Sequence, residues 1–341
     1  MTQYSLSGLG WSEHFAHQID DGETATPARV AEVTRSTLSV LTEAGPDSLV
    51  TPDSTGLYAV GDWVLRDGPR AVRRLERNTE IARRAAGPVA ERQLIAANVD
   101  TLAIVTSCNA DFNVARLERY LAMASQAGCL PLIVLTKADQ SDDPSEYVKT
   151  AARLSSIVTA FAIDGRDADD VARLNAWCGP GQTLALVGSS GVGKTTLQNH
   201  LTGVMAEVQG IREDDAKGRH TTTARSLRPT LAGGWLIDTP GIRELQLSDA
   251  AEGIWSVFSD VTDLIGDCRF NNCTHESEPG CAVQAAIAAG ELDPERLTRW
   301  RKLSREDRFS TESVAEARAR AKSFGKMTKT GKWLGKKKRG E

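Results

Sequence analysis

Apolar runs and helical stretches alternate through the middle of the chain. The apolar, β-branched runs lie at 101–106, 131–136 and 157–163, and the helical stretches at 114–126, 145–154 and 169–177. A further apolar run begins at Leu184 and ends in a glycine-rich turn. This alternation predicts an α/β domain with a mostly parallel sheet and helices on both faces. Because ligands of such sheets bind beyond the carboxyl ends of the strands, the residues there are the first candidates for chemistry.

A different pattern precedes this domain. Short β-like runs at 29–33, 38–41, 57–65 and 71–75 are separated by Gly, Pro, Asp and Ser turns. They predict a small antiparallel barrel of the oligonucleotide-binding type. Seven arginines stand between 66 and 84 against three acids, and they could contact phosphate, although a solvated barrel face explains them nearly as well. Residues 1–27 show no clear periodicity, so we expect a mobile or loosely packed extension there.

The glycine-rich turn fits the G-x-x-x-x-G-K-[ST] phosphate-binding loop. Its residues are Gly188, Ser189, Ser190, Gly191, Val192, Gly193, Lys194, Thr195 and Thr196. The glycines allow successive backbone N–H groups to point at phosphate oxygens at the start of a helix. Lys194 would supply charge to the β- and γ-phosphates, and the Thr195 hydroxyl would bind Mg²⁺. A Gly/Ser-rich surface turn is the competing interpretation, which the flanking strand and helix patterns disfavour.

A second motif follows the apolar run at 131–136 and selects the base. It consists of Thr136, Lys137, Ala138 and Asp139, where guanine-nucleotide-binding proteins carry Asn-Lys-x-Asp. An aspartate there accepts hydrogen bonds from the ring N–H and the amine of guanine, which adenine cannot offer, so Asp139 favours GTP over ATP. Thr136 replaces the usual asparagine. In 160–165, a Ser-Ala-type turn would bring a backbone amide to the guanine oxygen, and only Ala162 matches that turn.

Two later segments have the character of switch loops. Trp235 to Gly241 is a strand that ends in Asp-x-x-Gly, so Asp238 would hold Mg²⁺ through water and the Gly241 amide would sense the γ-phosphate. In the polar segment 218–223, we expect Thr222 to complete the Mg²⁺ shell, although a β-edge stretch is the alternative. The base motif precedes the phosphate loop, the reverse of the usual order, which indicates a circular permutation.

The six cysteines divide into two sets. Three are scattered and are expected to be small core residues in a reducing compartment. The others form C-x₄-C-x-H-x₅-C with a histidine: Cys268, Cys273, His275 and Cys281. Three thiolates and an imidazole suffice for one closed, structural, tetrahedral Zn²⁺ site. Disulfides would need an oxidising compartment that nothing else supports. Helical segments follow near 282–289 and 294–303.

Charge is distributed unevenly along the chain. The net charge is −4, yet residues 318–341 hold ten Lys or Arg and one Glu, about +9, which leaves about −13 on the rest. A basic tail on an acidic body favours a polyanionic partner, nucleic acid before membrane, although a solvated tail is the plain alternative. Neither a membrane span nor a signal peptide is evident. We expect a cytoplasmic protein, monomeric and without a membrane partner.

Taken together, these motifs resemble the circularly permuted, ribosome-small-subunit-dependent GTPase A family (RsgA/YjeQ type). The resemblance rests on the order of 136–139, 188–195, 218–223 and 238–241, followed by 268–270 and 273–281. It implies an α/β multidomain protein with an oligonucleotide-binding barrel (28–95), a permuted GTPase domain (96–260) and a helical zinc-binding domain (261–310). An N-terminal extension (1–27) and a basic tail (311–341) flank them. It also implies binding to the small ribosomal subunit and its rRNA, a role in late maturation of that subunit, and stimulation by it.

The implied cofactors are GTP or GDP, Mg²⁺ and one structural Zn²⁺. Lys194, the loop amides and Mg²⁺ on Thr195 and Asp238 would stabilise the charge that develops during hydrolysis. Ile242 has no polar group where many GTPases keep a glutamine, so His220 is the best candidate to position water, although a structural histidine is equally plausible. The alternatives are an RNA-binding GTP/GDP switch in which hydrolysis only resets binding, and an ATP-dependent enzyme.

Overall fold

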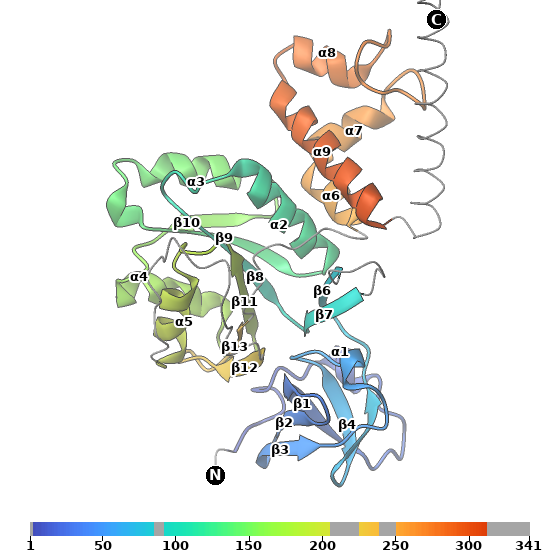
Figure 1. Cartoon of the computed structure of the whole chain (residues 1–341), viewed down its shortest axis with the longest axis vertical. Coiled ribbons are helices and arrows are strands. Elements are labelled where there is room, and N and C mark those ends of the chain that lie inside the picture. Colours follow the sequence, from blue (N-terminus) through green and yellow to red (C-terminus); the bar gives the residue numbers. More distant parts are fainter. Residues whose placement is uncertain (1–2, 85–91, 205–224, 239–249, 312–341) are drawn as a thin grey trace, which may run out of the picture.

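A computed structural model describes residues 3–84, 92–204, 225–238 and 250–311 of the 341-residue chain. Three parts follow one another along the long axis of the molecule: a small barrel, an α/β domain and a group of helices (Figure 1). The predicted fold class is confirmed, with a large parallel sheet, a barrel before it and helices after it. Within these residues, no helix combines the length and apolar character that crossing a membrane requires.

The barrel is built from five short strands. They are β1 (Thr26–Val33), β2 (Leu38–Thr42), β3 (Gly45–Leu49), β4 (Trp63–Asp67) and β5 (Arg70–Arg74). β1 pairs antiparallel with both β2 and β4, β2 pairs with β3, and β4 pairs with β5. A parallel bridge between Val50 and Arg70 links the end of β3 to β5. The interior is apolar, with Val30, Leu38 and Leu49 fully buried. β3 was not predicted, because its central residues are exposed and polar.

The N-terminal segment is packed, so the expectation of a loose extension is wrong for its described part. It contains α1 (Glu13–Ala16), and Leu9 and Phe15 are buried. Trp11 meets the Trp63 ring edge-on at 4.8 Å, and Phe15 lies 5.8 Å from the same ring. The Trp235 indole donates a hydrogen bond to the Gly8 carbonyl at 2.8 Å. These aromatic contacts occur in irregular turns, which leave no periodicity in the sequence.

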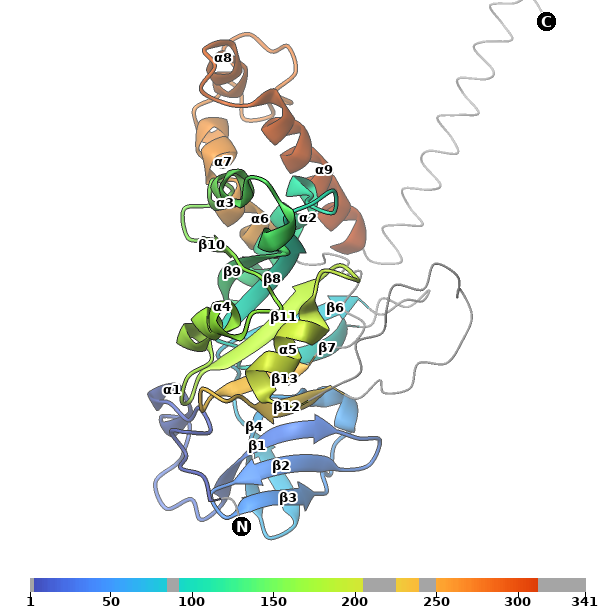
Figure 2. The same cartoon turned by 90° about the vertical axis from the view of Figure 1, so that its left-hand side faces the viewer.

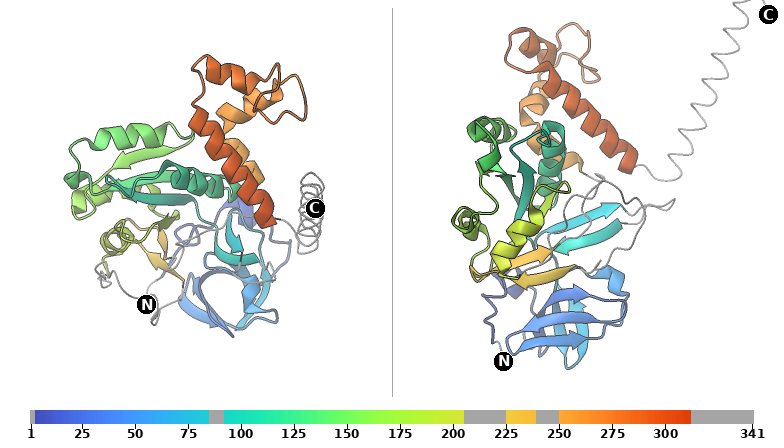
Figure 3. Two further views of the ribbon diagram at one scale, coloured as in Figure 1. Left: turned by 45° about the horizontal axis from the view of Figure 1, so that its top comes forward. Right: turned by 60° about the vertical axis from the view of Figure 1, so that its left-hand side comes forward.

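A two-stranded ribbon follows the barrel. It consists of β6 (Glu80–Arg84) and β7 (Arg92–Ala97), paired antiparallel, and it projects beside the α/β domain (Figure 3). Ile81 and Ile95 are buried in the main core. Neither strand was predicted.

The α/β domain holds the sheet that the alternating pattern predicts. Its strands are β8 (Thr101–Ser107), β9 (Leu130–Thr136), β10 (Thr159–Ala162), β11 (Thr183–Gly188), β12 (Ser226–Pro229) and β13 (Trp235–Asp238). Its helices are α2 (Val114–Gln126), α3 (Pro144–Ala152), α4 (Ala168–Ala172) and α5 (Lys194–Thr202). It also contains two short 3-10 helices, η2 (Ala138–Gln140) and η3 (Arg173–Trp177), and a third, η1 (Thr55–Leu57), lies in the barrel. The strand order is β10-β9-β8-β11-β13-β12. The first five are parallel, and β12 runs antiparallel to β13.

The two faces of this sheet are covered by different helices. Leu102 and Ile104 of β8 belong to the core that contains α2 and α3. Ala103 and Val105, which point the other way, belong to the core that contains α4 and α5. Burial on both faces explains why these strands read as continuous apolar runs. The chain passes from β8 outward to β9 and β10 and then returns to β11, so the change of direction lies between β8 and β11.

The barrel and the α/β sheet are joined. β12 pairs with β1 through Glu32 and Ser226, so the hydrogen-bonded strands continue from one domain into the other (Figure 2). Beside this junction, the fully buried Arg29 donates to the carbonyls of Leu9 and Asn98 and, at 2.7 Å, to the Thr183 hydroxyl. Burial lowers the pKa of Arg29 to about 10, although its charge attraction to Asp100 opposes the shift. Arg29 therefore connects the N-terminal segment, the barrel and the α/β domain.

The helices after the sheet, which we call the helical module, are α6 (Ala251–Val257), α7 (Ser259–Gly266), α8 (Ala282–Ala288) and α9 (Pro294–Thr311). α6 lies directly against α2, and α9 packs along both α6 and α7 (Figure 1). A Cβ on Gly253 would lie 2.0 Å from the Ala122 carbonyl oxygen, so only glycine permits this approach of the two helices.

Candidate functional site

The phosphate loop lies between β11 and α5, as its sequence predicts. Gly188, Gly191 and Gly193 have φ values of 144°, 78° and 94°, which favour glycine. A Cβ on Gly188 would lie 2.1 Å from the Val105 carbonyl oxygen of β8, so the loop could not approach that strand with a side chain there. The Lys194 ammonium donates to the carbonyls of Gly188, at 2.8 Å, and Ser189. The lysine therefore lies over the loop that would receive phosphates.

The base loop, residues 136–139, starts at the carboxyl end of β9 and lies beside the phosphate loop. Thr136 is buried, and its hydroxyl lies 2.7 Å from the Val192 carbonyl and 3.0 Å from the Thr106 carbonyl. The threonine that replaces the usual asparagine therefore ties the base loop to the phosphate loop. Lys137 adopts φ 59°, and Asp139 is exposed in η2. The two motifs that the sequence separates by about fifty residues meet at one edge of the sheet.

The loop after β10, residues 162–165, completes this edge. The Ala138 amide donates to the Ile163 carbonyl at 3.2 Å, and the Ile163 amide donates to the Leu135 carbonyl at 2.8 Å. A Cβ built on Gly165 would lie 3.8 Å from the Thr136 methyl. The three loops therefore adjoin one another around Thr136.

The predicted Mg²⁺ residues lie on neighbouring elements. Thr195 is in the first turn of α5, directly after β11. Asp238 is the last residue of β13, which pairs with β11 through Ile237 and Ala185. Mg²⁺ prefers oxygen ligands, which both residue types offer. The register of β11 and β13 places Thr195 and Asp238 at the same end of the sheet. The other predicted residues of this site, His220, Thr222 and Gly241, lie outside the described residues.

The predicted cysteine and histidine ligands come together in a cluster that could hold a metal ion. The ligand atoms of Cys268, Cys273, His275 and Cys281 all lie within 4.8 Å of one another. The Cys268 and Cys281 sulfurs are 3.9 Å apart, much farther than a disulfide allows, and both lie near the Nδ1 atom of His275, at 3.5 and 3.6 Å. Three thiols and an imidazole converging on one point fit a closed tetrahedral Zn²⁺ site.

Surrounding groups hold the His275 ligand in place. His275 has φ 59°, and its carbonyl accepts a hydrogen bond from the side-chain Nε2 of Gln284. Burial, followed by the nearby Arg301 guanidinium, lowers the pKa of His275 and so favours the neutral imidazole that binds metals. Hydrogen bonds from the Thr274 hydroxyl and from backbone amides lower the pKa of Glu278 to about 2. The loop is therefore ordered by its own hydrogen bonds around the cluster.

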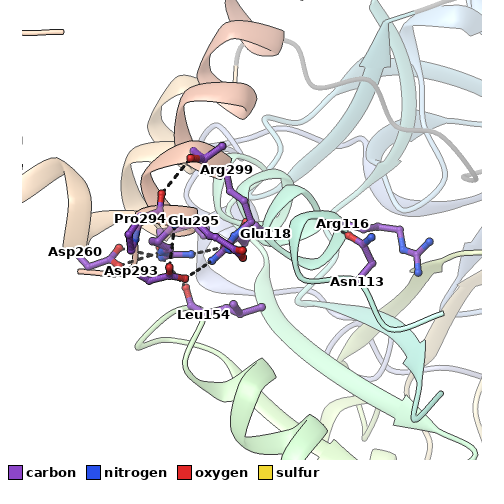
Figure 4. A network of polar contacts seen from close by, with 12 residues as sticks. Asn113, Arg116, Glu118, Leu154, Asp260, Asp293, Pro294, Glu295 and Arg299 are labelled. Carbon is purple, nitrogen blue, oxygen red and sulfur yellow. Dashed lines mark hydrogen bonds and ion pairs between the residues drawn. The ribbon is translucent and has the colours of Figure 1, made fainter. Parts of the chain in front are cut away.

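A buried ion network fixes the helical module to α2 (Figure 4). The Glu118 carboxylate, 1% exposed, accepts from Arg296 at 2.7 Å and from Arg299 at 2.9 Å. Arg296 also pairs with Asp260 at 3.0 Å and donates to the Leu154 carbonyl. None of these contacts was predicted, because Glu118 and Arg296 are 178 residues apart. Charged residues at helical spacing give no signal of a partner so distant in the chain.

Five of the seven arginines between 66 and 84 divide into two groups. Three are in ion pairs: Arg66 with Asp47, Arg73 with Glu23, and Arg77 with both Asp62 and Glu80. Arg70 and Arg74 are exposed on β5, on either side of the exposed Val72, and make no ion pair within the described residues. The first group is held in these ion pairs, so Arg70 and Arg74 are the candidates among these five for contact with phosphate.

Comparison with known proteins places this arrangement in a family. A model of the RsgA GTPase family matches residues 74–248. A relative from Mesorhizobium japonicum, named "Small ribosomal subunit biogenesis GTPase RsgA", is 53% identical over 90% of this chain and 91% of its own. The chain belongs to the RsgA GTPase family. As a member of that family it is a GTP hydrolase.

Other members agree with this assignment. The "RsgA 2" protein of Vibrio parahaemolyticus is 47% identical over 96% of this chain and 93% of its own. The fold also resembles two solved structures, each at 20% sequence identity and a TM-score of 0.59. YjeQ from Thermotoga maritima matches over 81% of this chain and 96% of its own. YloQ, described as a circularly permuted GTPase, matches over 85% of this chain and 98% of its own. This chain likewise carries its base loop before its phosphate loop.

Proposed function

We propose that this RsgA-family protein binds the small ribosomal subunit, acts in its late maturation, and hydrolyses GTP when that particle stimulates it. The meeting of three loops around Thr136, which joins a base loop to a phosphate loop, carries the guanine nucleotide part of the proposal. The printed names of the relatives support the ribosomal part. The exposed Arg70 and Arg74 of the barrel, and the basic segment 318–341, supply charge suited to rRNA phosphates.

The reaction is the in-line attack of water on the γ-phosphorus of GTP, which gives GDP and inorganic phosphate. Lys194 exchanges its hydrogen bonds to loop carbonyls for stronger, charge-assisted bonds to phosphate oxygens. The amides of the glycine-rich loop donate to the same oxygens. Thr195, Asp238 and Thr222 would hold Mg²⁺, which would supply positive charge that stabilises the phosphates. The Gly241 amide senses the γ-phosphate.

His220 positions the attacking water in this proposal, because Ile242 offers no polar group at the position that many GTPases fill with glutamine. A His220→Ala variant tests the role directly. We expect the turnover stimulated by the particle to fall while the affinity for GTP is unchanged. Stimulated turnover that stays intact in this variant would remove His220 from the mechanism.

The Zn²⁺ centre is structural in this proposal. Four protein ligands leave no open position for water or substrate. Zn²⁺ would hold the 268–281 loop against α8 and α9, which carry Gln284 and Arg301, the residues that bond to the loop backbone. The ion would thereby keep the helical module folded.

The decisive experiment measures GTP turnover with purified small ribosomal subunits, with large subunits, and alone. We expect slow turnover alone and acceleration by small subunits only. Equal turnover in all three, or equal competition by ATP, would contradict the proposal. The switch alternative is tested by blocking hydrolysis and following release from the particle under GTP, GDP and a non-hydrolysable analogue. If the maturation step continues after the block, hydrolysis only resets binding.

A further inference from the structure

The 162–165 loop is held at two points by one ion pair. Arg173 Nη1 donates to the Ala162 carbonyl at 3.0 Å, and the Asp170 carboxylate accepts from the Asp164 amide at 2.8 Å. Asp170 and Arg173 also pair with each other at 3.2 Å. The Ala162 carbonyl and the Asp164 amide are therefore both held by one ion pair, that of Asp170 with Arg173.

Arg173 is placed by a stack of rings as well as by charge. Its guanidinium lies 4.7 Å from the centre of the Phe161 ring. Trp177 also stacks with that ring, at 5.4 Å between centroids and 21° between the planes. Phe161 occupies the serine position of a Ser-Ala-type turn. A phenylalanine cannot form the hydrogen bonds that a serine hydroxyl could give to such a turn. The contacts of Asp170 and Arg173 supply polar bonds to the turn instead.

The loop that they hold adjoins the base loop directly. The Ile163 carbonyl accepts from the Ala138 amide, next to Asp139, and Gly165 lies beside Thr136 and against Leu197 of α5. The amides of Ile163 and Asp164 are already bonded within the protein. Any shift of this loop would move the remaining amides relative to the base loop.

We propose that Asp170 and Arg173 are positioning residues for guanine, which hold the 162–165 loop so that one of its backbone amides donates to O6 of the base. This inference rests on the proposed binding of guanine nucleotides. Asp139 and the loop bind different atoms of guanine: the Asp139 carboxylate accepts hydrogen bonds from N1 and the 2-amino group, and the 162–165 loop donates one to O6. Guanine presents all three groups, whereas adenine has an amine in place of O6 and no N1–H.

The test measures dissociation constants of the full-length, zinc-loaded protein with Mg²⁺ for four nucleotides: GDP, IDP, 6-thio-GDP and ADP. IDP lacks the 2-amino group, and 6-thio-GDP replaces O6 with sulfur, a weak acceptor. The variants are Arg173→Ala and Asp170→Asn. Arg166→Ala is the matched control, because Arg166 follows the same loop, is exposed, and its side chain has no described contact. Arg173→Lys retains a cationic donor toward the Ala162 carbonyl.

We expect Arg173→Ala to weaken GDP binding about 5- to 10-fold, the loss of roughly one hydrogen bond to the base. The affinity for IDP should fall by the same factor, because the missing 2-amino group is a partner of Asp139 and not of the 162–165 loop. The affinity for 6-thio-GDP should fall less than about twofold, because the hydrogen bond from the loop amide to sulfur is already weak. Asp170→Asn should follow the same pattern with a smaller loss. Arg173→Lys should restore most of the affinity, and Arg166→Ala should change nothing.

The outcomes separate the inference from the function on which it rests. Equal losses for GDP and 6-thio-GDP, or no loss in either variant, would overturn the positioning role. A wild-type protein that binds ADP as tightly as GDP would instead refute guanine specificity itself. Melting temperatures measured without nucleotide identify a variant that has unfolded. If Arg173→Ala has unfolded, the affinities of Asp170→Asn for the four nucleotides decide whether the positioning role holds.

Discussion

Glu118 carries the charge that connects α2 to the helical module, and its removal gives a sharp prediction. Its carboxylate is 1% exposed and lies 2.7 Å from Arg296 and 2.9 Å from Arg299. Breaking a buried pair costs about 3–5 kcal/mol, because the remaining charge loses its compensation. Arg296 would keep Asp260 and the Leu154 carbonyl. We therefore expect Glu118→Ala to cost about 3 kcal/mol, the lower end of that range.

Hydrogen exchange followed by mass spectrometry measures this loss of stability locally, at the interface between α2 and the helical module. The several parts of this chain need not unfold in a single step, so a global unfolding curve could mix their contributions. Peptides from α2 and α9 report the opening of their own interface. A loss of about 3 kcal/mol should accelerate their exchange roughly 100-fold. Peptides from the barrel strands should exchange as in the wild type.

A second ion pair on the same helix provides the control. Arg119 pairs with Glu306 of α9 at 2.5 Å, but the two side chains are 36% and 29% exposed. Exposed pairs contribute about 1 kcal/mol or less, so Arg119→Ala should accelerate exchange less than about fivefold. Replacing Glu118 by Leu together with Arg296 by Met should recover most of the loss, because the buried pair becomes apolar and Arg299, 21% exposed, keeps Asp293 and Glu295. Equal exchange in Glu118→Ala and Arg119→Ala would refute the argument from burial.

Further predictions concern the nucleotide site and the metal. Gly188→Ala should abolish GDP binding in calorimetry and lower the melting temperature, because its Cβ would lie 2.1 Å from the Val105 carbonyl. Lys194→Ala should reduce GTP turnover at least about 100-fold in a phosphate-release assay, since a charge directed at the phosphates is lost. Asp139→Asn should shift binding from GTP toward XTP in a competition assay, and an unchanged preference would contradict guanine recognition by this residue. Cys273→Ser, or treatment with a chelator, should release one zinc per chain by elemental analysis and unfold the helical module by circular dichroism.

The phosphate loop, the alternation of strands and helices in the α/β domain and the metal cluster could be predicted because their signals are local. A loop that requires positive φ at Gly188, Gly191 and Gly193 needs glycine at those positions, whatever the rest of the chain does. Strands buried on both faces have apolar runs at a recognisable length. Four ligands within fourteen positions, from Cys268 to Cys281, form a pattern that few other functions explain.

The packing of the N-terminal segment could not be predicted in the same way. Its buried residues, Leu9 and Phe15, lie in turns and a single short helix, so they repeat at neither the helical nor the strand period. Trp63, which lies against Phe15, is about fifty residues later, on β4. The charge count of the barrel was also ambiguous, because a sequence does not distinguish Arg77, which is paired and nearly buried, from Arg74, which is exposed.

The permuted chain order gives the helical module a direct covalent connection to the nucleotide site. Residues 239–249 are all that separate Asp238, at the end of β13, from Ala250, where the helical module begins. The Ala250 amide donates at 2.8 Å to the buried carboxylate of Asp307 on α9. The far end of that segment is thus anchored to the helix that carries Arg296, and through Glu118 to α2. The covalent path from the end of β13 therefore reaches the helical module at a residue whose backbone is held by α9.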